Sequence, residues 1–399
     1  MLTIRAMSNG EGYASRHLAH SDYYAEGERV GGLWFGRGAV VLGLSGEVQF
    51  QDFEAVREGL DPRTGEFLRQ RHSADRIDAD GSTRSHGRNL YDFTFSAPKS
   101  VSILAELAGD RRLIEAHQHA VEEALHELES HAATGVRRGG ANYNRTTGNL
   151  IIAVYHHDTS RELDPQLHTH AVAGNLTWDG AEQRWKALQA YPIYERRAYL
   201  TEVYRNALAR EVLRLGYEIE DRRDAKGHNV GFEIRGVSDD LVSKYSQRSK
   251  QRDQAIEEFI RANGRRPTDN EVAVLVRETR AEKLIEISSA AKKAQQIERL
   301  SADEAQSLNS LRHSTAEALT AVNRFSYSAA QSLLYAEDHI YERVSVARDY
   351  ELFAEALRNG RGHLNLPELQ GRLSAQESAG HILRAGAEVG TRDSLDRER

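Results

Sequence analysis

Residues 149–175, NLIIAVYHHDTSRELDPQLHTHAVAGN, decide the fold that the sequence predicts. Residues 150–155 form a continuous apolar run rich in Ile and Val, which is typical of a buried strand. Residues 167–173 alternate between two kinds of side chain, as a strand with two different faces does. The segment between them is polar and contains a proline, so the stretch predicts an antiparallel hairpin.

Histidines cluster where the two predicted strands meet. Side chains in a strand have period two, so His168 and His170 project from the same face. The hairpin brings either His156 or His157, at the end of the first strand, beside them. A lone His on a strand is more often structural, but three converging imidazoles make a metal site with open positions. Without a carboxylate or thiolate ligand such a site stays cationic and suits an anionic substrate.

Composition narrows the class of protein. The 399 residues are enough for two or three domains, and the absence of Cys excludes disulfides and thiolate metal sites. No apolar run of about 18 residues and no signal-peptide pattern occur, so we expect a cytoplasmic protein without membrane insertion. The net charge of −7 argues against a generally basic nucleic-acid coat but permits a local basic groove.

The remaining patterns mix strands and helices without a regular βαβ repeat. YDFTFSAPKS, residues 91–100, alternates like a half-buried strand, and a helix is expected from 99 to 107. Mostly apolar residues at helical spacing predict two long helices. The face of the first helix consists of Leu113, His117, Ala120, Val121, Ala124, Leu125 and Leu128. The face of the second consists of Leu200, Tyr204, Leu208, Val212 and Leu215. The predicted class is α+β, with a central antiparallel sheet and helices packed on it in a two-layer, palm-like sandwich, followed by a mainly helical C-terminal region.

The change in composition near residue 238 predicts three parts. Residues 1–237 would form the metal-dependent core, 238–300 a charged helical region, and 301–399 a mostly helical extension. A capping box at Thr268 and Glu271 supports a helix start in the middle part. The polar end of the sequence suggests a fragment of a longer protein.

Two further residue types complete a chemical hypothesis. Asp92 lies on a strand expected beside the hairpin, where it would hold a His ring through its second nitrogen or accept a proton. Tyr23 and Tyr24 stand together near acidic and basic residues, and a tyrosine activated beside a cation can form a covalent phosphodiester. Ordinary packing is the alternative role for these two aromatic residues.

The sequence resembles the relaxase domain of conjugative mobilisation proteins of the F-plasmid type, within the superfamily named for a His-hydrophobic-His motif. Stretches in the same order carry the resemblance over most of residues 1–240: MLTI, DYYAEGE, LWFGRGAVVLGLSGEV, YDFTFSAPKSVS, TGNLIIAVYHHDTSRELDPQLHTHAV and RWKAL. In relatives the helical region after 238 closes over DNA, and the last part links such domains to a helicase.

The resemblance implies an enzyme that nicks one DNA strand at a transfer origin. A tyrosine attacks the scissile phosphate, forms a 5′-phosphotyrosine link and frees a 3′-hydroxyl, and a later attack by such a hydroxyl rejoins the strand. Motif matching makes His157, His168 and His170 the metal ligands and Asp92 the support of a ligand or a base. Arg161, inside the connection of the hairpin, would contact phosphate, and Lys99 is a weaker candidate for the same role.

The family usually carries two tyrosine pairs near its N-terminus. Tyr23 and Tyr24 match the second pair, and Tyr13, followed by Ala14, is what remains of the first. Tyr13 is therefore the first candidate for the initial cleavage, ahead of Tyr23 and Tyr24.

Cofactor and partners follow from the resemblance. The family is described with Mg²⁺ or Mn²⁺, whereas three imidazoles would also accept Ni²⁺ or Zn²⁺. The partners would be single-stranded DNA at the transfer origin, relaxosome accessory proteins and a type IV secretion coupling protein, with passage into a recipient cell. Three alternatives remain: a rolling-circle replication initiator, a metal-dependent DNA hydrolase without a covalent intermediate, and a DNA-binding module with a structural metal.

Overall fold

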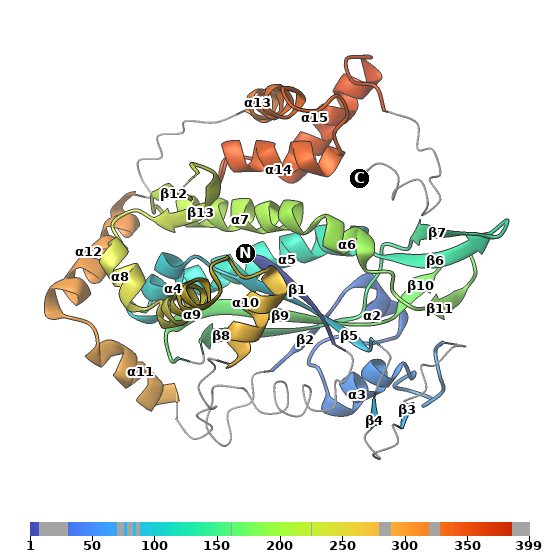
Figure 1. The fold of residues 1–399 in the computed structure, drawn as a ribbon, viewed down its shortest axis with the longest axis horizontal. Helices are drawn as coiled ribbons and strands as arrows, with labels where there is room; N and C mark the ends of the chain where they lie inside the picture. Colours follow the sequence, from blue (N-terminus) through green and yellow to red (C-terminus); the bar gives the residue numbers. More distant parts are fainter. Residues whose placement is uncertain are drawn as a thin grey trace.

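The chain folds around a five-stranded sheet in which each strand runs antiparallel to its neighbours (Figure 1). The computed structural model describes residues 1–7, 31–69, 76–77, 83–84, 88–160, 162–224, 226–278, 289–318 and 328–384. From edge to edge the strands are β1 (Leu2–Met7), β5 (Leu90–Ser96), β9 (Pro165–Gly174), β8 (Ile152–Thr159) and β2 (Leu33–Phe35). The predicted hairpin is confirmed as β8 and β9, and so is the α+β fold.

Both faces of the sheet are covered where β5 runs. Phe93 points into the main hydrophobic core, whereas Leu90 packs in a second, smaller core with Phe53 of α3 (Phe50–Glu58). The prediction of a half-buried β5 is therefore wrong, because this strand lies inside the sheet and even Asp92 is only 4% exposed.

Helices cover the face of the sheet that belongs to the main core. α5 (Arg111–Ser130) and α7 (Arg197–Arg214) pack against each other, and α4 (Lys99–Glu106) lies beside β9. Every residue of the predicted α5 face is buried, which confirms that pattern. α7 ends before Gly216, whose φ of 89° lies in the left-handed region that glycine adopts without strain.

A third layer of helices lies on α7, on the side away from the sheet (Figure 1). It consists of α13 (Ala329–Tyr341), α14 (Asp349–Asn359) and α15 (Leu366–Ser378). Leu333, Leu357 and Leu369 of these helices belong to the same buried cluster as the sheet. The division at residues 237 and 300 stays a prediction, but the hydrophobic core runs across both of its boundaries.

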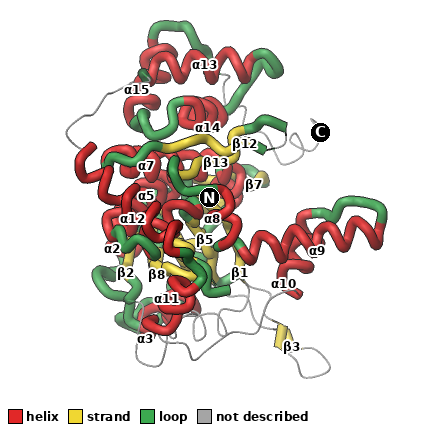
Figure 2. The backbone as a smooth tube through the Cα atoms, turned by 90° about the vertical axis from the view of Figure 1, so that its left-hand side faces the viewer, coloured by secondary structure: helices red, strands yellow, loops and turns green. Residues whose placement is uncertain are grey.

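The middle part of the chain is helical, as expected. Figure 2 shows α9 and α10 projecting from the body of the protein. The capping box of Thr268 and Glu271 is present at the start of α10. The helices of this part are α8 (Asp239–Lys244), α9 (Gln247–Asn263), α10 (Asp269–Glu278) and α11 (Ser289–Glu298), and α12 (Ala302–Ala318) follows in the next part. In the described part of the chain no helix has the length and apolar character needed to cross a membrane.

Small hairpins and two short helices complete the fold. These are α2 (Arg37–Val41), α6 (Tyr191–Glu195) and the strand pairs β3 (Arg76–Ile77) with β4 (Thr83–Arg84), β6 (Ala133–Arg138) with β7 (Ala141–Thr146), β10 (Thr177–Asp179) with β11 (Arg184–Lys186), and β12 (Ile219–Arg223) with β13 (Asn229–Ile234).

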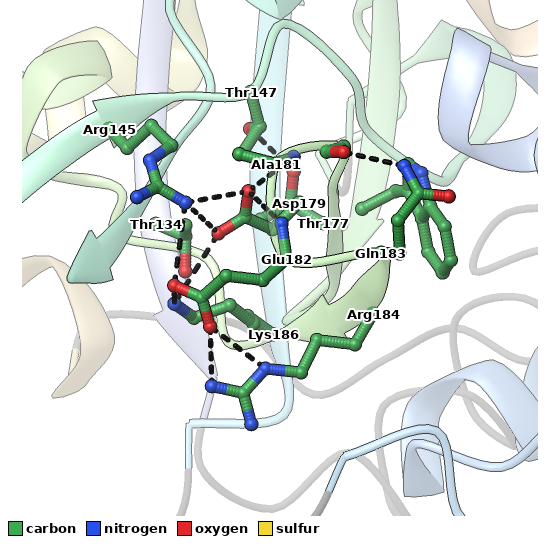
Figure 3. A network of polar contacts seen from close by, with 12 residues as sticks. Thr134, Arg145, Thr147, Thr177, Asp179, Ala181, Glu182, Gln183, Arg184 and Lys186 are labelled. Carbon is green, nitrogen blue, oxygen red and sulfur yellow. Dashed lines mark hydrogen bonds and ion pairs between the residues drawn. The ribbon is translucent and has the colours of Figure 1, made fainter.

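An ionic network joins two of these hairpins (Figure 3). Asp179 of β10 is 1% exposed and accepts two hydrogen bonds from Arg145 of β7, at 2.8 and 3.0 Å. Lys186 lies 3.4 Å from the same carboxylate, and Glu182 contacts both cations. Because a buried carboxylate is costly without partners, this network fixes the turn of β10 and β11 against β7.

Candidate metal centre and active site

The sheet register gathers three imidazoles on the face opposite α5 and α7. His157 of β8 lies directly across from His168 of β9, and Tyr155 lies across from His170. Residues opposite each other in a ladder share a face, and so do residues two apart along a strand. His157, His168 and His170 therefore project together.

The ring positions agree with this register. The ring centroids are 5.1 Å apart for His157 and His168, 5.4 Å for His157 and His170, and 5.2 Å for His168 and His170. Imidazole nitrogens lie about 2.0–2.1 Å from Zn²⁺ in tetrahedral sites, which puts neighbouring ring centroids about 5 Å apart. The donor set and its spacing thus fit one ion.

The ring orientations do not yet make a finished site. Among the described residues no group of three or more His, Cys, Asp or Glu side chains is arranged to hold a metal ion. The rings of His157 and His168 are nearly parallel, at 22°, and both stand steeply to His170.

Hydrogen bonds at Nδ1 orient two of the imidazoles. The Nδ1–H of His170 donates to Asp92 Oδ2 at 2.9 Å, and the Nδ1–H of His168 donates to the carbonyl of Gln166 at 2.9 Å. Both acceptors lack a proton to give, so Nδ1 carries the proton in each hydrogen bond and Nε2 is the nitrogen left to face an ion. Burial and then the charge of His170 lower the pKa of His168 to about 4, which keeps its ring neutral near pH 7.

Strand periodicity left the choice between His156 and His157 open, the family resemblance favoured His157, and the register separates the two residues. His156 lies across from Thr169 and its Nδ1 is 2.8 Å from the Thr169 hydroxyl, on the main-core face. The same hydroxyl is 2.9 Å from His117 Nε2, and His117 Nδ1 is 2.8 Å from the Tyr204 hydroxyl. His156 thus belongs to a buried network that ties the hairpin to α5 and α7.

Asp92 lies beside the site, as the sequence predicts, with an additional partner that the sequence reasoning missed. Thr94 Oγ1 is 3.1 Å from Asp92 Oδ1 and 3.2 Å from His170 Nδ1. The period-two pattern could have found Thr94, because it shares the face of Asp92. Arg5 was missed as well: it lies across from Asp92 in β1 and is exposed, so it offers a cation on this face.

Lys99 contacts the protein backbone, whereas the sequence predicted a contact with phosphate. Its Nζ donates to the carbonyl of Pro165, the first residue of β9, at 2.9 Å. Burial lowers its pKa to about 8, against the raising effect of the Asp164 carboxylate. Lys99 therefore supports the hairpin connection, and its contact with phosphate stays a prediction.

Four predicted site residues lie outside the described part of the chain. They are Tyr13, Tyr23, Tyr24 and Arg161. Among the described residues, the structure brings together the three histidines and Asp92. His170 is the most accessible of these four, since 25% of its side chain is exposed.

Known proteins are similar to this chain in sequence and in fold. The family described as TrwC relaxase matches residues 7–302. The multifunctional conjugation protein TraI of Escherichia coli K12 is 37% identical over 256 residues, which are 62% of this chain and 14% of that protein. This chain thus spans only a small part of the length of its curated relative.

Solved structures extend the comparison to the fold. The conjugative relaxase TrwC in complex with oriT DNA, in a metal-bound form, has a TM-score of 0.61 and 32% identity over 75% of this chain and 97% of that one. A copper-bound form of the TrwC–oriT complex has a TM-score of 0.62 and 33% identity over 77% of this chain and 99% of that one.

Proposed function

The chain belongs to the TrwC relaxase family, and from this premise we propose that it nicks one DNA strand at a transfer origin. The observation that carries the proposal is the set of three imidazoles on one face of β8 and β9, with Asp92 bonded to one of them. The relatives described as bound to oriT DNA share more than 30% identity with it.

The three histidines are proposed as the ligands of a divalent ion. His157, His168 and His170 would hold it through ring nitrogens and leave positions open toward the partly exposed side of His170. A bound divalent ion polarises a phosphoryl oxygen and offsets the negative charge that develops there. The donor set favours Mn²⁺, Ni²⁺ or Zn²⁺ over Mg²⁺.

Asp92 is proposed as a positioning residue more than as a base. Both of its oxygens lie within 3.1 Å of His170 Nδ1, and Oδ1 also accepts from Thr94. A carboxylate so engaged fixes the tautomer and orientation of the ring and raises its basicity as a ligand. A free base would need an oxygen that can reach the attacking hydroxyl.

The nucleophile is proposed to be a tyrosine, with Tyr13 first and Tyr23 or Tyr24 as alternatives. Its phenolate oxygen forms a bond to phosphorus as the bond to the 3′-oxygen breaks, and that oxygen leaves as a 3′-hydroxyl after taking up a proton. The phosphotyrosine conserves the bond energy, so a later 3′-hydroxyl can rejoin the strand by the reverse step.

Phosphate contacts are proposed for Arg5, an exposed cation on the ligand face, and for Arg161. Arg5 is exposed and pairs with Asp92 in the sheet, and Arg161 lies in the connection between β8 and β9. Such contacts make affinity for single-stranded DNA fall with rising salt. Accessory relaxosome proteins, a secretion coupling protein and a cytoplasmic site of action with transfer into a recipient cell complete the proposal.

The test mixes the protein, Mn²⁺ and a labelled single-stranded oligonucleotide that carries the origin sequence, and resolves the products on a denaturing protein gel. The proposal expects a covalent protein–DNA band that a chelator abolishes. Cleavage without that band would indicate a hydrolase, and binding alone would indicate a DNA-binding module with a structural metal.

A further inference from the structure

α11 is attached to the connection between β8 and β9 by polar side chains. Lys292 and Gln296 are 3% and 2% exposed, whereas Ile297 is 48% exposed. A helix on a protein surface usually packs through an apolar stripe. In the described part of α11 the buried anchors are instead a cation and an amide.

Three side chains of this segment form one row of contacts. Lys292 Nζ lies 3.4 Å from Asp158, Gln296 Nε2 donates to the Leu163 carbonyl at 2.8 Å, and Arg299 donates to Asp164 at 2.8 Å. Lys292 and Gln296, four residues apart, lie on one face of α11, and Arg299 directly follows the helix.

The partners of this row adjoin the proposed ligands. Asp158 directly follows His157 in the sequence. Asp164 directly precedes β9 and lies four residues before His168. The row therefore bridges the two ends of the connection that sets His157 opposite His168.

Asp164 is the centre of the contact. Its carboxylate is 1% exposed and also accepts from the backbone N–H of Gln247 at 2.8 Å and from its side chain at 3.0 Å. Arg299 in turn donates to the Lys244 carbonyl at 2.7 Å and lies 4.5 Å over the ring of Tyr245. One buried carboxylate thus ties the connection to the start of α9 and to the residue that follows α11.

The connection itself is held in an unusual conformation. Leu163 has a φ of 60°, in the left-handed region that side chains other than glycine rarely adopt. The β8–β9 ladder also shifts register between His157 and Thr159. The bonds from Gln296 and Arg299 fall on Leu163 and Asp164, directly before β9 begins.

We propose that Lys292, Gln296 and Arg299 form a reversible polar clasp on this connection and act as positioning residues for the three histidines. Docking of α11 and binding of a divalent ion then favour each other, since both select the same arrangement of the connection. The proposal rests on the metal site of the proposed function.

The test compares the full chain with its variants Lys292→Ala, Asp164→Asn and Lys293→Ala. Lys293 is the matched control, because it is the exposed neighbour of Lys292 and its replacement changes helix propensity equally. Two quantities are measured: Mn²⁺ affinity by titration calorimetry, and hydrogen exchange of the amides in residues 289–298 with and without Mn²⁺.

The clasp predicts that Mn²⁺ slows exchange in α11 of the wild type and of Lys293→Ala. It also predicts that Lys292→Ala and Asp164→Asn lose that response and bind Mn²⁺ about fivefold more weakly or worse, a coupling at the lower end of the usual range. Equal Mn²⁺ affinity and equal slowing of exchange in all four proteins would overturn it.

The two proposals fail in different ways. A wild type that takes up no Mn²⁺ refutes the metal site and the linkage with it. Normal uptake that no clasp variant alters refutes the clasp alone. Circular dichroism of Asp164→Asn checks that its loss of Mn²⁺ affinity does not reflect unfolding. Lys292→Ala tests the same linkage at a less buried ion pair, because the partner of Lys292, Asp158, is 34% exposed.

Discussion

Replacing Asp92 by Asn tests whether the carboxylate beside His170 prepares that ring to bind an ion. The substitution keeps the shape of the side chain and removes its charge. Asp92 is 4% exposed and lies 2.9 Å from His170 Nδ1, so its hydrogen bond is buried and charge-assisted. We expect the tautomer that leaves Nε2 unprotonated to be favoured less in the variant.

The magnitude follows from the contact. A hydrogen bond to a charged group contributes about 1.5–3 kcal/mol. Since about 1.4 kcal/mol corresponds to a tenfold change in an equilibrium constant, the expected loss of Mn²⁺ affinity is about 10-fold to 100-fold. Asn can still accept from Nδ1–H, which places the expectation for Asp92→Asn near the tenfold end.

Titration calorimetry with Mn²⁺ measures the effect, and Thr94→Val is the control. Thr94 contacts both Asp92 and His170, at 3.1 and 3.2 Å, and Val preserves its shape. The control removes a neutral hydroxyl but leaves the carboxylate, so it should weaken binding less than Asp92→Asn does. An Asp92→Asn protein with wild-type affinity would refute the positioning role.

Further predictions concern the ligand, the buried His network and the hairpins. His168→Ala should abolish nicking but retain most of the affinity for single-stranded DNA in a binding assay; full activity would exclude the metal site. Burial lowers the pKa of His156 from 6.5 to about 4, so the unfolded chain binds this proton more tightly. Stability should therefore fall between pH 6.5 and 4, by up to about 3 kcal/mol from this group. Urea unfolding of His156→Gln should show a flatter pH dependence, and an unchanged slope would contradict this assignment. Arg145→Ala deprives the buried Asp179 of its main partner and should lower the free energy of unfolding by about 1–3 kcal/mol in urea, without changing Mn²⁺ affinity.

The hairpin of the sheet and the shared face of His168 and His170 could be predicted because both depend on short-range periodicity. Alternation in 167–173 placed His168 and His170 together, and the turn signal paired the strands. The choice of His157 over His156 depends on the register across the hairpin. The register shift between His157 and Thr159 is not encoded by any local pattern of the sequence.

Long-range polar contacts could not be predicted from the sequence, and the reason is physical. The side chains of Lys292, Gln296 and Arg299 look like a solvated helix face, because polar anchors carry no hydrophobic period. The packing of the C-terminal helices on α7 depends likewise on distant partners. The buried amide of Asn206, for example, donates to the Leu364 carbonyl at 2.8 Å and accepts from the Gly362 N–H at 2.9 Å.

The most direct test of a tyrosine relaxase asks which end of the cut strand stays on the protein. Attack by a tyrosine on the scissile phosphate leaves the 5′-phosphate, and with it the downstream fragment, attached to the protein. An oligonucleotide labelled at its 3′ end should therefore give a labelled protein band in Mn²⁺, whereas a 5′-labelled one should give only a free shorter strand. Replacing Tyr13, Tyr23 and Tyr24 together by Phe should remove the labelled band. A labelled band that persists in this triple variant, or that carries the 5′ label, would contradict the mechanism.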